Sequence, residues 1–371
     1  MKNIKKNPEP FKLSKRKKLF STYAILKIGL ALSIAVVSAC TKSQSADKQS
    51  TVKAKDSKLK TLSSCVTGCW IGVTNNANSE IELYSWYDMN WNGATARTWD
   101  WKPTTARLYS STEVSKWGIP NDFKLRTVAS WGGGVYVAVI GNAGLITIVD
   151  YATGNKKWAA IAGSSSVDNI HGIELLPTGN VAVAASTGGY VRVYASSGGA
   201  TTYASYTLTD AHQVLWDPAY NVLWAVGTNK LVALTVGTAS APSLTATATY
   251  TLPSDNWCHS VATKYGSNDT LFIASSNNVW TFDKKSHKFT IAPGLINRNG
   301  VKAISNQPDG TVVLTRPDIY KTPVPSEPST VNTDWTTSYV DYYTPDGVYI
   351  RSGHKTGAAY YRGFVYNTNY Q

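Results

Sequence analysis

Basic side chains recur at one position of a repeated pattern, and their types and spacing could do chemistry. Arg126, His171, His212, His259 and Lys302 are separated by intervals of 45, 41, 47 and 43 residues. A collar of cations and imidazoles invites a carboxylate or another anion. Arginine grips a carboxylate bidentately, lysine acts as a compact charge, and histidine serves as general base or acid near neutral pH. We therefore predict that these five residues line one site.

Each basic residue begins an apolar strand that is followed by a turn and a second apolar strand. His171 opens His-Gly-Ile-Glu-Leu-Leu-Pro-Thr-Gly-Asn-Val-Ala-Val-Ala, and His212 opens His-Gln-Val-Leu-Trp-Asp-Pro-Ala-Tyr-Asn-Val-Leu-Trp-Ala. A period of about 40–45 residues with several short strands is typical of the blades of a β-propeller. The first strand of each blade lines the propeller axis. Equivalent residues of successive blades are therefore expected to form a ring.

The rest of the sequence predicts an all-β domain of six blades, each with four antiparallel strands. Short β-branched and aromatic runs, separated by Gly, Asn, Asp and Pro, fill residues 61–371. Three strands are expected within residues 70–101, and a C-terminal strand at 358–366 joins them to close the ring. Seven blades are the alternative if residues 102–120 contain further strands.

Two further features of the last blades bear on the site. The innermost strand of the sixth blade lies near residues 355–362. Either Lys355 or Arg362 is therefore the candidate for the sixth member of the ring. Residues 316–334 form a proline-rich loop between two predicted strands. Loops of this length are usually functional or disordered.

Five stretches of the chain carry a resemblance to a known family: Asn169 to Ser186, Ala211 to Pro218, Leu223 to Gly227, the block that begins at His259, and Val301-Lys302. On these stretches the chain resembles a family of uncharacterised secreted bacterial propeller proteins that is grouped as a domain of unknown function. The resemblance spans roughly residues 70–371 and implies a propeller and an exported location, but no activity. The family's usual glycine before the third histidine is Cys258 here.

The net charge of +13 suggests a nucleic acid or an acidic lipid as partner, but its distribution argues against both. Residues 1–39 contain nine Lys or Arg and one acid, a net of +8, and residues 41–60 carry a net of +4. Residues 61–371 are left with a net charge of +1. A near-neutral domain has no electrostatic footprint for phosphate backbones. We therefore predict no nucleic-acid partner.

The N-terminus has the organisation of a secretory signal. Lysine-rich residues 2–18 precede an apolar run at 23–37, which is too short and too interrupted for a comfortable membrane span. The small residues before Cys40 resemble the bacterial lipobox, in which this cysteine becomes the lipidated first residue of the mature protein. Ordinary signal cleavage nearby is the alternative.

Three parts of the chain follow from this organisation. They are a lipoprotein signal peptide at 1–39, a lipidated cysteine with a disordered tether at 40–60, and a propeller domain at 61–371. We expect a monomer at the bacterial outer membrane or cell surface, held only by its lipid anchor. If Cys40 is not lipidated, the protein is expected to be periplasmic or secreted.

The remaining cysteines leave two interpretations. Cys65 and Cys69 are the candidates for a local disulfide in an exported protein, and Cys258 is then an odd thiol. The three ring histidines with Cys258 could instead ligate zinc or another divalent ion. Arginine and lysine in the same ring disfavour a cation, so no cofactor is expected and metal remains a weak alternative.

Aromatic residues add a further signal. The chain contains 13 Trp and 22 Tyr, which stack on sugar faces but also fill the interfaces between blades. Trp91, in the loop Met-Asn-Trp-Asn-Gly, is the tryptophan that we expect to be exposed and to contact a ligand.

These features favour a propeller that acts on or binds glycans. Imidazoles with arginine and lysine suit acidic sugars, because neutralising a uronate carboxylate acidifies the neighbouring C–H for β-elimination. His171, His212 and His259 are the candidate catalytic residues, and Arg126, Lys302, Lys355 or Arg362 are the candidate ligand-binding residues. The alternatives are a non-catalytic scaffold of the cell envelope that binds a protein or a glycan, and histidines that only cap strands. The sequence does not decide whether the protein is an enzyme.

Overall fold

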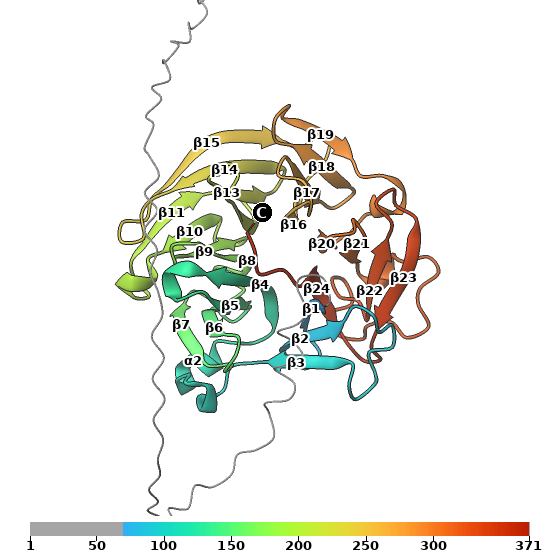
Figure 1. The fold of residues 1–371 in the computed structure, drawn as a ribbon, viewed down its shortest axis with the longest axis horizontal. Coiled ribbons are helices and arrows are strands. Elements are labelled where there is room, and N and C mark those ends of the chain that lie inside the picture. The colour runs from blue at the N-terminus through green and yellow to red at the C-terminus, as the bar shows by residue number, and fades with distance from the viewer. Residues whose placement is uncertain (1–69, 371) are drawn as a thin grey trace, which may run out of the picture. The chain divides into compact units, whose positions relative to one another are not determined.

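Six four-stranded antiparallel sheets stand as blades around a common axis in the computed structural model, which describes residues 70–370 (Figure 1). This arrangement confirms the predicted six-bladed propeller. The predicted signal peptide, Cys40, the tether and the Cys65–Cys69 disulfide lie outside the described residues.

Three blades follow each other through the first half of the propeller. The blade nearest the N-terminus among them contains β4 (Pro120–Val128), β5 (Gly134–Gly141), β6 (Leu145–Asp150) and β7 (Lys156–Ile161). The second contains β8 (Ile170–Leu175), β9 (Val181–Ala185), β10 (Tyr190–Tyr194) and β11 (Tyr203–Thr207). The third contains β12 (Ala211–Asp217), β13 (Val222–Gly227), β14 (Lys230–Val236) and β15 (Leu244–Thr251).

Two further blades continue the ring, and the last blade closes it. The fourth contains β16 (Ser260–Thr263), β17 (Thr270–Ala274), β18 (Val279–Asp283) and β19 (Lys288–Ile291). The fifth contains β20 (Ala303–Asn306), β21 (Val312–Thr315), β22 (Tyr339–Tyr343) and β23 (Tyr349–His354). The closing blade combines both ends of the chain: β24 (Tyr360–Val365), β1 (Trp70–Asn75), β2 (Glu80–Ser85) and β3 (Arg97–Trp101).

Closure depends on the antiparallel pairing of β24 with β1, which aligns Val365 with Ile71 and Phe364 with Gly72. Gly72 is required at this point because a Cβ atom there would lie 2.5 Å from the ring of Phe123. Pairing between the chain ends completes the fourth strand of the closing blade, with β24 as its innermost strand. It confirms the predicted closure by the C-terminal strand.

Residues 102–120 contain no additional blade. Apart from the start of β4, they form the 3₁₀ turn η1 (Thr105–Arg107) and the short helix α2 (Ser111–Ser115). A capping box between Ser110 and Glu113 begins this helix. The other short 3₁₀ turns are η2 (Ala129–Trp131), η3 (Ser196–Gly198), η4 (Gly294–Ile296) and η5 (Asp318–Tyr320). No helix within residues 70–370 is long and apolar enough to cross a membrane.

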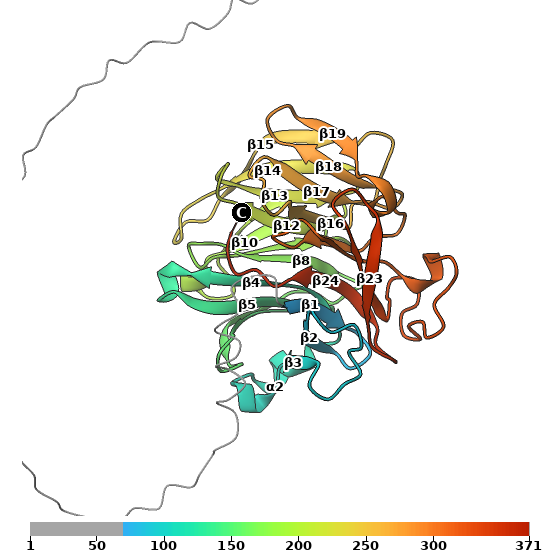
Figure 2. The same ribbon diagram turned by 45° about the vertical axis from the view of Figure 1, so that its right-hand side comes forward.

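The hydrophobic core lies between neighbouring blades. Ala138 and Ile140 of β5, for example, are buried in one cluster with Ile173 of β8 and Val183 of β9. Alternating apolar residues of each sheet thus face the next sheet, as expected for strands that pack on both sides. Figure 2 shows the outer strands β3, β15, β19 and β23 at the periphery, and the innermost strands surround the axis.

Bulges mark the beginning of several innermost strands. The register of β4 shifts between Pro120 and Asp122, that of β8 between Ile170 and Gly172, and that of β12 between Ala211 and Gln213. The pairing of β24 shifts at the corresponding end, between its partners Val73 and Asn75. A bulge leaves one residue out of the ladder and re-aims its side chain. The residues left out of the pairing in this way are Asn121, His171, His212 and, in β24, both Tyr361 and Arg362.

Candidate functional site

A cavity of about 860 Å³ opens on the axis at the end of the propeller where the innermost strands begin. We call it the funnel. Its deepest residues come from all six blades and stand at or just before the first residues of the innermost strands. They are Asn121, His171, His212, His259, Lys302 and Tyr361, and we call them the funnel floor.

The three imidazoles, the lysine and the tyrosine form a continuous series of contacts. The rings of His171 and His212 are stacked with their centroids 4.5 Å apart, and those of His212 and His259 meet edge to face at 5.2 Å. The Lys302 ammonium lies 3.1 Å from Nε2 of His259. At the other end of the series, the Tyr361 hydroxyl lies 3.1 Å from Nδ1 of His171. The predicted convergence of these histidines with Lys302 is therefore observed.

Burial and positive neighbours set the protonation of these groups. The pKa of His171 is well below its usual value because the ring is buried, and His212 and Arg362 lower it further. The pKa of His259 is also well below its usual value, because of burial and then of Lys302. Burial, with a contribution from Arg362, lowers the pKa of Lys302 to about 8. At neutral pH the floor thus presents neutral His171 and His259 beside a protonated amine.

His212 is held differently from the other two histidines. Its Nδ1 lies 3.0 Å from the backbone carbonyl of Asp210 and 3.2 Å from the Asp210 carboxylate. Asp210 also lines the funnel. A carbonyl oxygen can only accept, so Nδ1 of His212 donates the bond to the Asp210 carbonyl, which fixes the orientation of the ring between its two neighbours.

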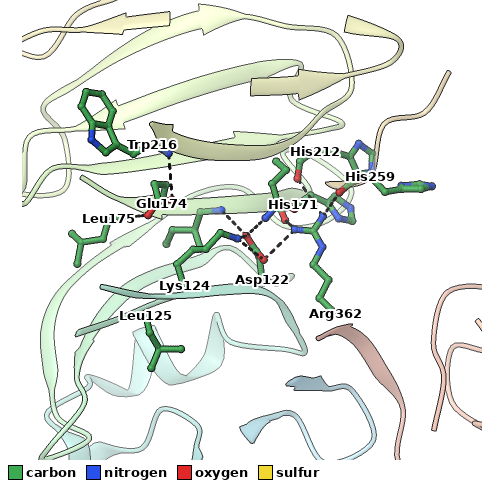
Figure 3. A network of polar contacts seen from close by, with 12 residues as sticks. Asp122, Lys124, Leu125, His171, Glu174, Leu175, His212, Trp216, His259 and Arg362 are labelled. Atoms are coloured by element: carbon green, nitrogen blue, oxygen red, sulfur yellow. Dashed lines mark hydrogen bonds and ion pairs between the residues drawn. The ribbon is translucent and has the colours of Figure 1, made fainter. Parts of the chain in front are cut away.

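Arg362 lies directly beneath the histidines and is completely buried (Figure 3). Its guanidinium donates to the backbone carbonyls of His171 at 2.8 Å, His259 at 2.8 Å and His212 at 3.3 Å. It also forms an ion pair with Asp122, at 3.2 Å. Sequence analysis predicted that Lys355 or Arg362 completes the ring. The structure places Tyr361 at that position of the funnel and Arg362 one layer deeper, next to the bulge in β24.

Asp122 joins the arginine to the neighbouring blades. It accepts from the backbone N–H of Ile173 at 3.0 Å and from Nε2 of Gln213 at 2.9 Å, and Lys124 lies 3.3 Å away. The strand β4 begins several residues before the predicted one, so sequence analysis missed this carboxylate. Charge-assisted bonds of this kind are stronger than neutral ones and hold the blades together, although Nε of Arg362 and Oε1 of Gln213 have no hydrogen-bond partner among the described residues.

Arg126 is not part of the funnel. It lies near the other end of β4, where its guanidinium forms a bidentate pair with Glu174 at 2.7 and 2.8 Å. The residue of β4 that takes the position of His171 is Asn121. The prediction for Arg126 was wrong because the first copy of the pattern is loose, and its register was assigned to the wrong end of the strand.

Two other predicted ligand-binding residues lie elsewhere. Lys355 follows β23 and does not line the funnel. Trp91, predicted to be exposed, is 1% exposed and stacks on Tyr84 with the ring centroids 4.4 Å apart. Its Nε1 donates to the carbonyl of Asp88. The loop around Trp91 folds inward because an indole fills the space above Gly353, where a Cβ atom would lie 2.3 Å from the ring.

Cys258 does not join the histidines as a potential metal ligand. Its side chain is buried in an apolar cluster with Leu252, Val261 and Phe282, and burial raises the pKa of its thiol to about 12. Within residues 70–370 no group of three or more His, Cys, Asp or Glu side chains is arranged to hold a metal ion.

Three aromatic side chains that sequence analysis missed line the funnel beside the fourth and fifth blades, and we call them the aromatic rim. Trp257, Tyr320 and Trp335 line the cavity, and Trp257 is 57% exposed. Trp257 adopts a left-handed backbone conformation with φ of +54°, next to Cys258 and His259. Its position two residues before a ring histidine was the available signal. Tyr320 belongs to the long loop at 316–334, which was predicted to be functional or disordered, and Trp335 follows that loop immediately.

Two buried aspartates hold the segments that carry this rim. Asp318 accepts from the backbone N–H groups of Ser329 and Ser338, both at 2.9 Å, and from the Thr337 hydroxyl at 2.6 Å. Asp255, near Trp257, accepts from the side chains of Asn278 at 3.0 Å and Trp280 at 3.1 Å. The rim is therefore built on fixed loops.

Comparison with known proteins identifies a family for this chain, and the function of that family is unknown. Residues 87–322, more than half of the chain, match a family of unknown function, DUF6528. A similar solved structure is the crystal structure of a protein of unknown function from Bacteroides caccae, with a TM-score of 0.49 and 10% identity over 81% of this chain and 99% of that one. No curated protein matches the sequence. The chain belongs to the family of unknown function DUF6528.

Proposed function

We propose that the funnel binds an acidic glycan, with a uronate carboxylate placed at Lys302. The observation that carries this proposal is the isolation of the Lys302 charge. Its ammonium contacts the imidazole of His259 at 3.1 Å, and no carboxylate pairs with it within residues 70–370. A half-buried ammonium that lacks an anion attracts one from solution, and the fixed positive charge of Arg362 lies beneath it.

The walls of the funnel suit the rest of a sugar. They present amide side chains and hydroxyl groups, which can both donate to and accept from sugar hydroxyls. Exposed aromatic faces at the rim stack on the C–H surfaces of sugars. A cavity of about 860 Å³ falls in the size range of specific ligand sites. The amides are those of Asn121, Asn142, Asn169, Asn277 and Asn299, and the hydroxyls are those of Ser165, Ser186, Thr187 and Ser276.

The contact between His171 and Tyr361 favours catalysis by β-elimination. Neutral His171 would take the proton from the carbon next to the uronate carboxylate, while Lys302 neutralises that carboxylate. The electron pair forms a carbon–carbon double bond, and the bond to the leaving glycosidic oxygen breaks. Tyr361 would donate its proton to that oxygen. The buried tyrosine has a raised pKa, which keeps its hydroxyl protonated at neutral pH.

An absorbance assay tests this chemistry. The purified protein is incubated with a panel of polyuronates, and the ultraviolet absorbance of unsaturated products is followed. We expect a signal from at least one polymer, its loss in the double variant His171→Ala/His212→Ala, and a large loss in Tyr361→Phe. Lys355→Met is the matched control, because this lysine lies outside the funnel. Binding without absorbance would support the non-catalytic alternative, and an undiminished signal in the double variant would refute the mechanism.

We also propose that the protein is an exported lipoprotein. The small residues before Cys40 support this, together with the concentration of positive charge in residues 1–60. Expression in a bacterial host with a radiolabelled fatty acid tests it. Label should enter the wild type and not Cys40→Ala, and equal labelling of both would refute the proposal.

A further inference from the structure

The axial channel of the propeller is divided into two separate cavities. The funnel occupies one end. A second cavity of about 80 Å³ lies at the other end, and the two share no lining residue. The second cavity has room for only a few water molecules. The C-terminal segment crosses this region, where Thr368 accepts from the backbone of Thr127 at 2.8 Å and Tyr370 donates to the carbonyl of Leu175 at 2.6 Å.

One layer of residues separates the cavities. Along β24, Tyr361 lines the funnel and Phe364 lines the second cavity, whereas Arg362 between them lines neither. Along β4, Asn121 and Phe123 face the two cavities and Asp122 lines neither. The partition therefore consists of the residues that directly follow the funnel floor in each blade. They are Asp122, Gly172, Gln213, Ser260, Ala303 and Arg362.

The partition is rigid because its charged groups are completely buried and bonded across blades. Arg362 binds the three histidine carbonyls, and Asp122 ties Arg362 to Gln213 and to the backbone of β8. Gly172 leaves the space that this packing needs, since a Cβ atom there would lie 2.6 Å from the Cα of Gln213. Moving Arg362 aside would break its buried ion pair with Asp122 and remove its hydrogen bonds to three backbone carbonyls, which is costly.

We propose that the funnel recognises the end of an acidic glycan chain and not its interior. This inference rests on the proposed function. A polysaccharide that reached Lys302 in mid-chain would have to continue past the partition or double back within the funnel. The partition blocks the first route. The deep position of the floor, where His212, His259 and Tyr361 are almost buried, disfavours the second. If the site is catalytic, it releases products from one chain terminus.

The test measures binding stoichiometry against chain length. Oligogalacturonates are separated into short and long fractions of known mean length, and each is titrated calorimetrically into the purified protein. We expect one protein molecule per chain in both fractions. At equal uronate mass, the long fraction contains fewer chains. It should therefore bind fewer protein molecules, in inverse proportion to its mean chain length. The variant Lys355→Met should behave as the wild type, and Lys302→Met should bind both fractions at least about 10-fold more weakly.

The two proposals fail in different ways. A number of bound protein molecules that rises in proportion to chain length would overturn chain-end recognition and leave glycan binding intact. The absence of heat with both fractions, together with none from other uronate oligosaccharides, would overturn the proposed function. If the site is catalytic, product analysis gives a second readout. Early accumulation of a single small product supports action at a terminus, and a broad ladder of intermediate lengths contradicts it.

Discussion

The carboxylate of Asp122 and the guanidinium of Arg362 form an ion pair at 3.2 Å in which both side chains are completely buried. The pair joins β4 to β24, so it couples the first complete blade to the strand that closes the ring. It also lies immediately below the histidines of the funnel. One interaction therefore links the stability of the closed propeller to the position of its candidate site.

Replacing Arg362 by methionine should destabilise the protein by about 3 kcal/mol, because it breaks a buried ion pair and leaves Asp122 with Lys124, at 3.3 Å, as its one ion-pair partner among the described residues. Three histidine carbonyls lose their donor in the same variant. Chemical denaturation monitored by circular dichroism measures the change. Lys285→Met, which breaks an exposed ion pair with Asp269, is the control and should have little effect. Equal stabilities of Arg362→Met and the wild type would contradict the role of the pair.

The stability of the protein should fall as the pH drops below about 6.5. His171 and His259 have lowered pKa values in the folded state, whereas their unfolded-state value is near 6.5. The unfolded state therefore binds protons first, and each histidine costs up to about 1.4 kcal/mol per pH unit until its folded-state pKa is reached. The positive groups that lower these values are His212, Arg362 and Lys302, and Tyr361 faces His171.

Melting temperatures of the variant His171→Asn across this pH range check the prediction. The decline should be shallower than in the wild type, while His287→Asn should follow the wild type because His287 is exposed. Parallel curves for all three proteins would show that His171 does not titrate as the structure indicates.

Asp318 should control the order of the aromatic rim. Its carboxylate accepts four hydrogen bonds from Ser329, Thr337 and Ser338 and pairs with Lys321 at 3.2 Å. Asp318→Asn removes the charge from these bonds and should destabilise the protein by about 2 kcal/mol. It should also increase hydrogen exchange in residues 316–338, which carry Tyr320 and Trp335. Unchanged exchange in this segment would refute the assignment of Asp318 as its anchor.

Trp257 should report on occupation of the funnel. It is the more exposed of the two exposed tryptophans at the rim, the other being Trp335, so iodide should quench the fluorescence of both and a bound oligouronate should protect them. Trp257→Phe should lose the larger part of this protectable fraction, and Trp257→Phe/Trp335→Phe should lose all of it. Trp91→Phe should retain it, because Trp91 is buried in a stack with Tyr84. Protection that persists in the double variant would place the ligand elsewhere.

The repeated pattern predicted the part of the site that regular strand spacing determines. His171, His212, His259 and Lys302 occupy equivalent positions because each blade repeats the same path, and they do meet at the axis. The pattern failed where the chain departs from that regularity. Arg126 was assigned to the wrong end of β4, whose first residues have no histidine or lysine to mark the repeat.

Other features depend on local geometry that sequence spacing does not encode. The bulge in β24 determines that Tyr361 faces the funnel and that Arg362 lies in the partition. The exposure of Trp257 and the burial of Trp91 follow from the paths of two loops. Both tryptophans have similar polar neighbours in the sequence, so composition alone could not distinguish them. The six-bladed architecture and its closure were predictable because they need only strand counts and the pairing of the chain ends.

The central claim is that the Lys302 charge binds the carboxylate of an acidic sugar. Calorimetric titration of the wild type and Lys302→Met with trigalacturonic acid, and with its neutral galactose counterpart, tests this claim most directly. A charge-assisted contact contributes about 1.5–3 kcal/mol, so the variant should bind trigalacturonic acid at least about 10-fold more weakly. Wild-type affinity should also fall as the pH rises through about 8, where Lys302 loses its proton. Equal affinity of the two proteins, or equal binding of the charged and neutral sugars, would contradict the account.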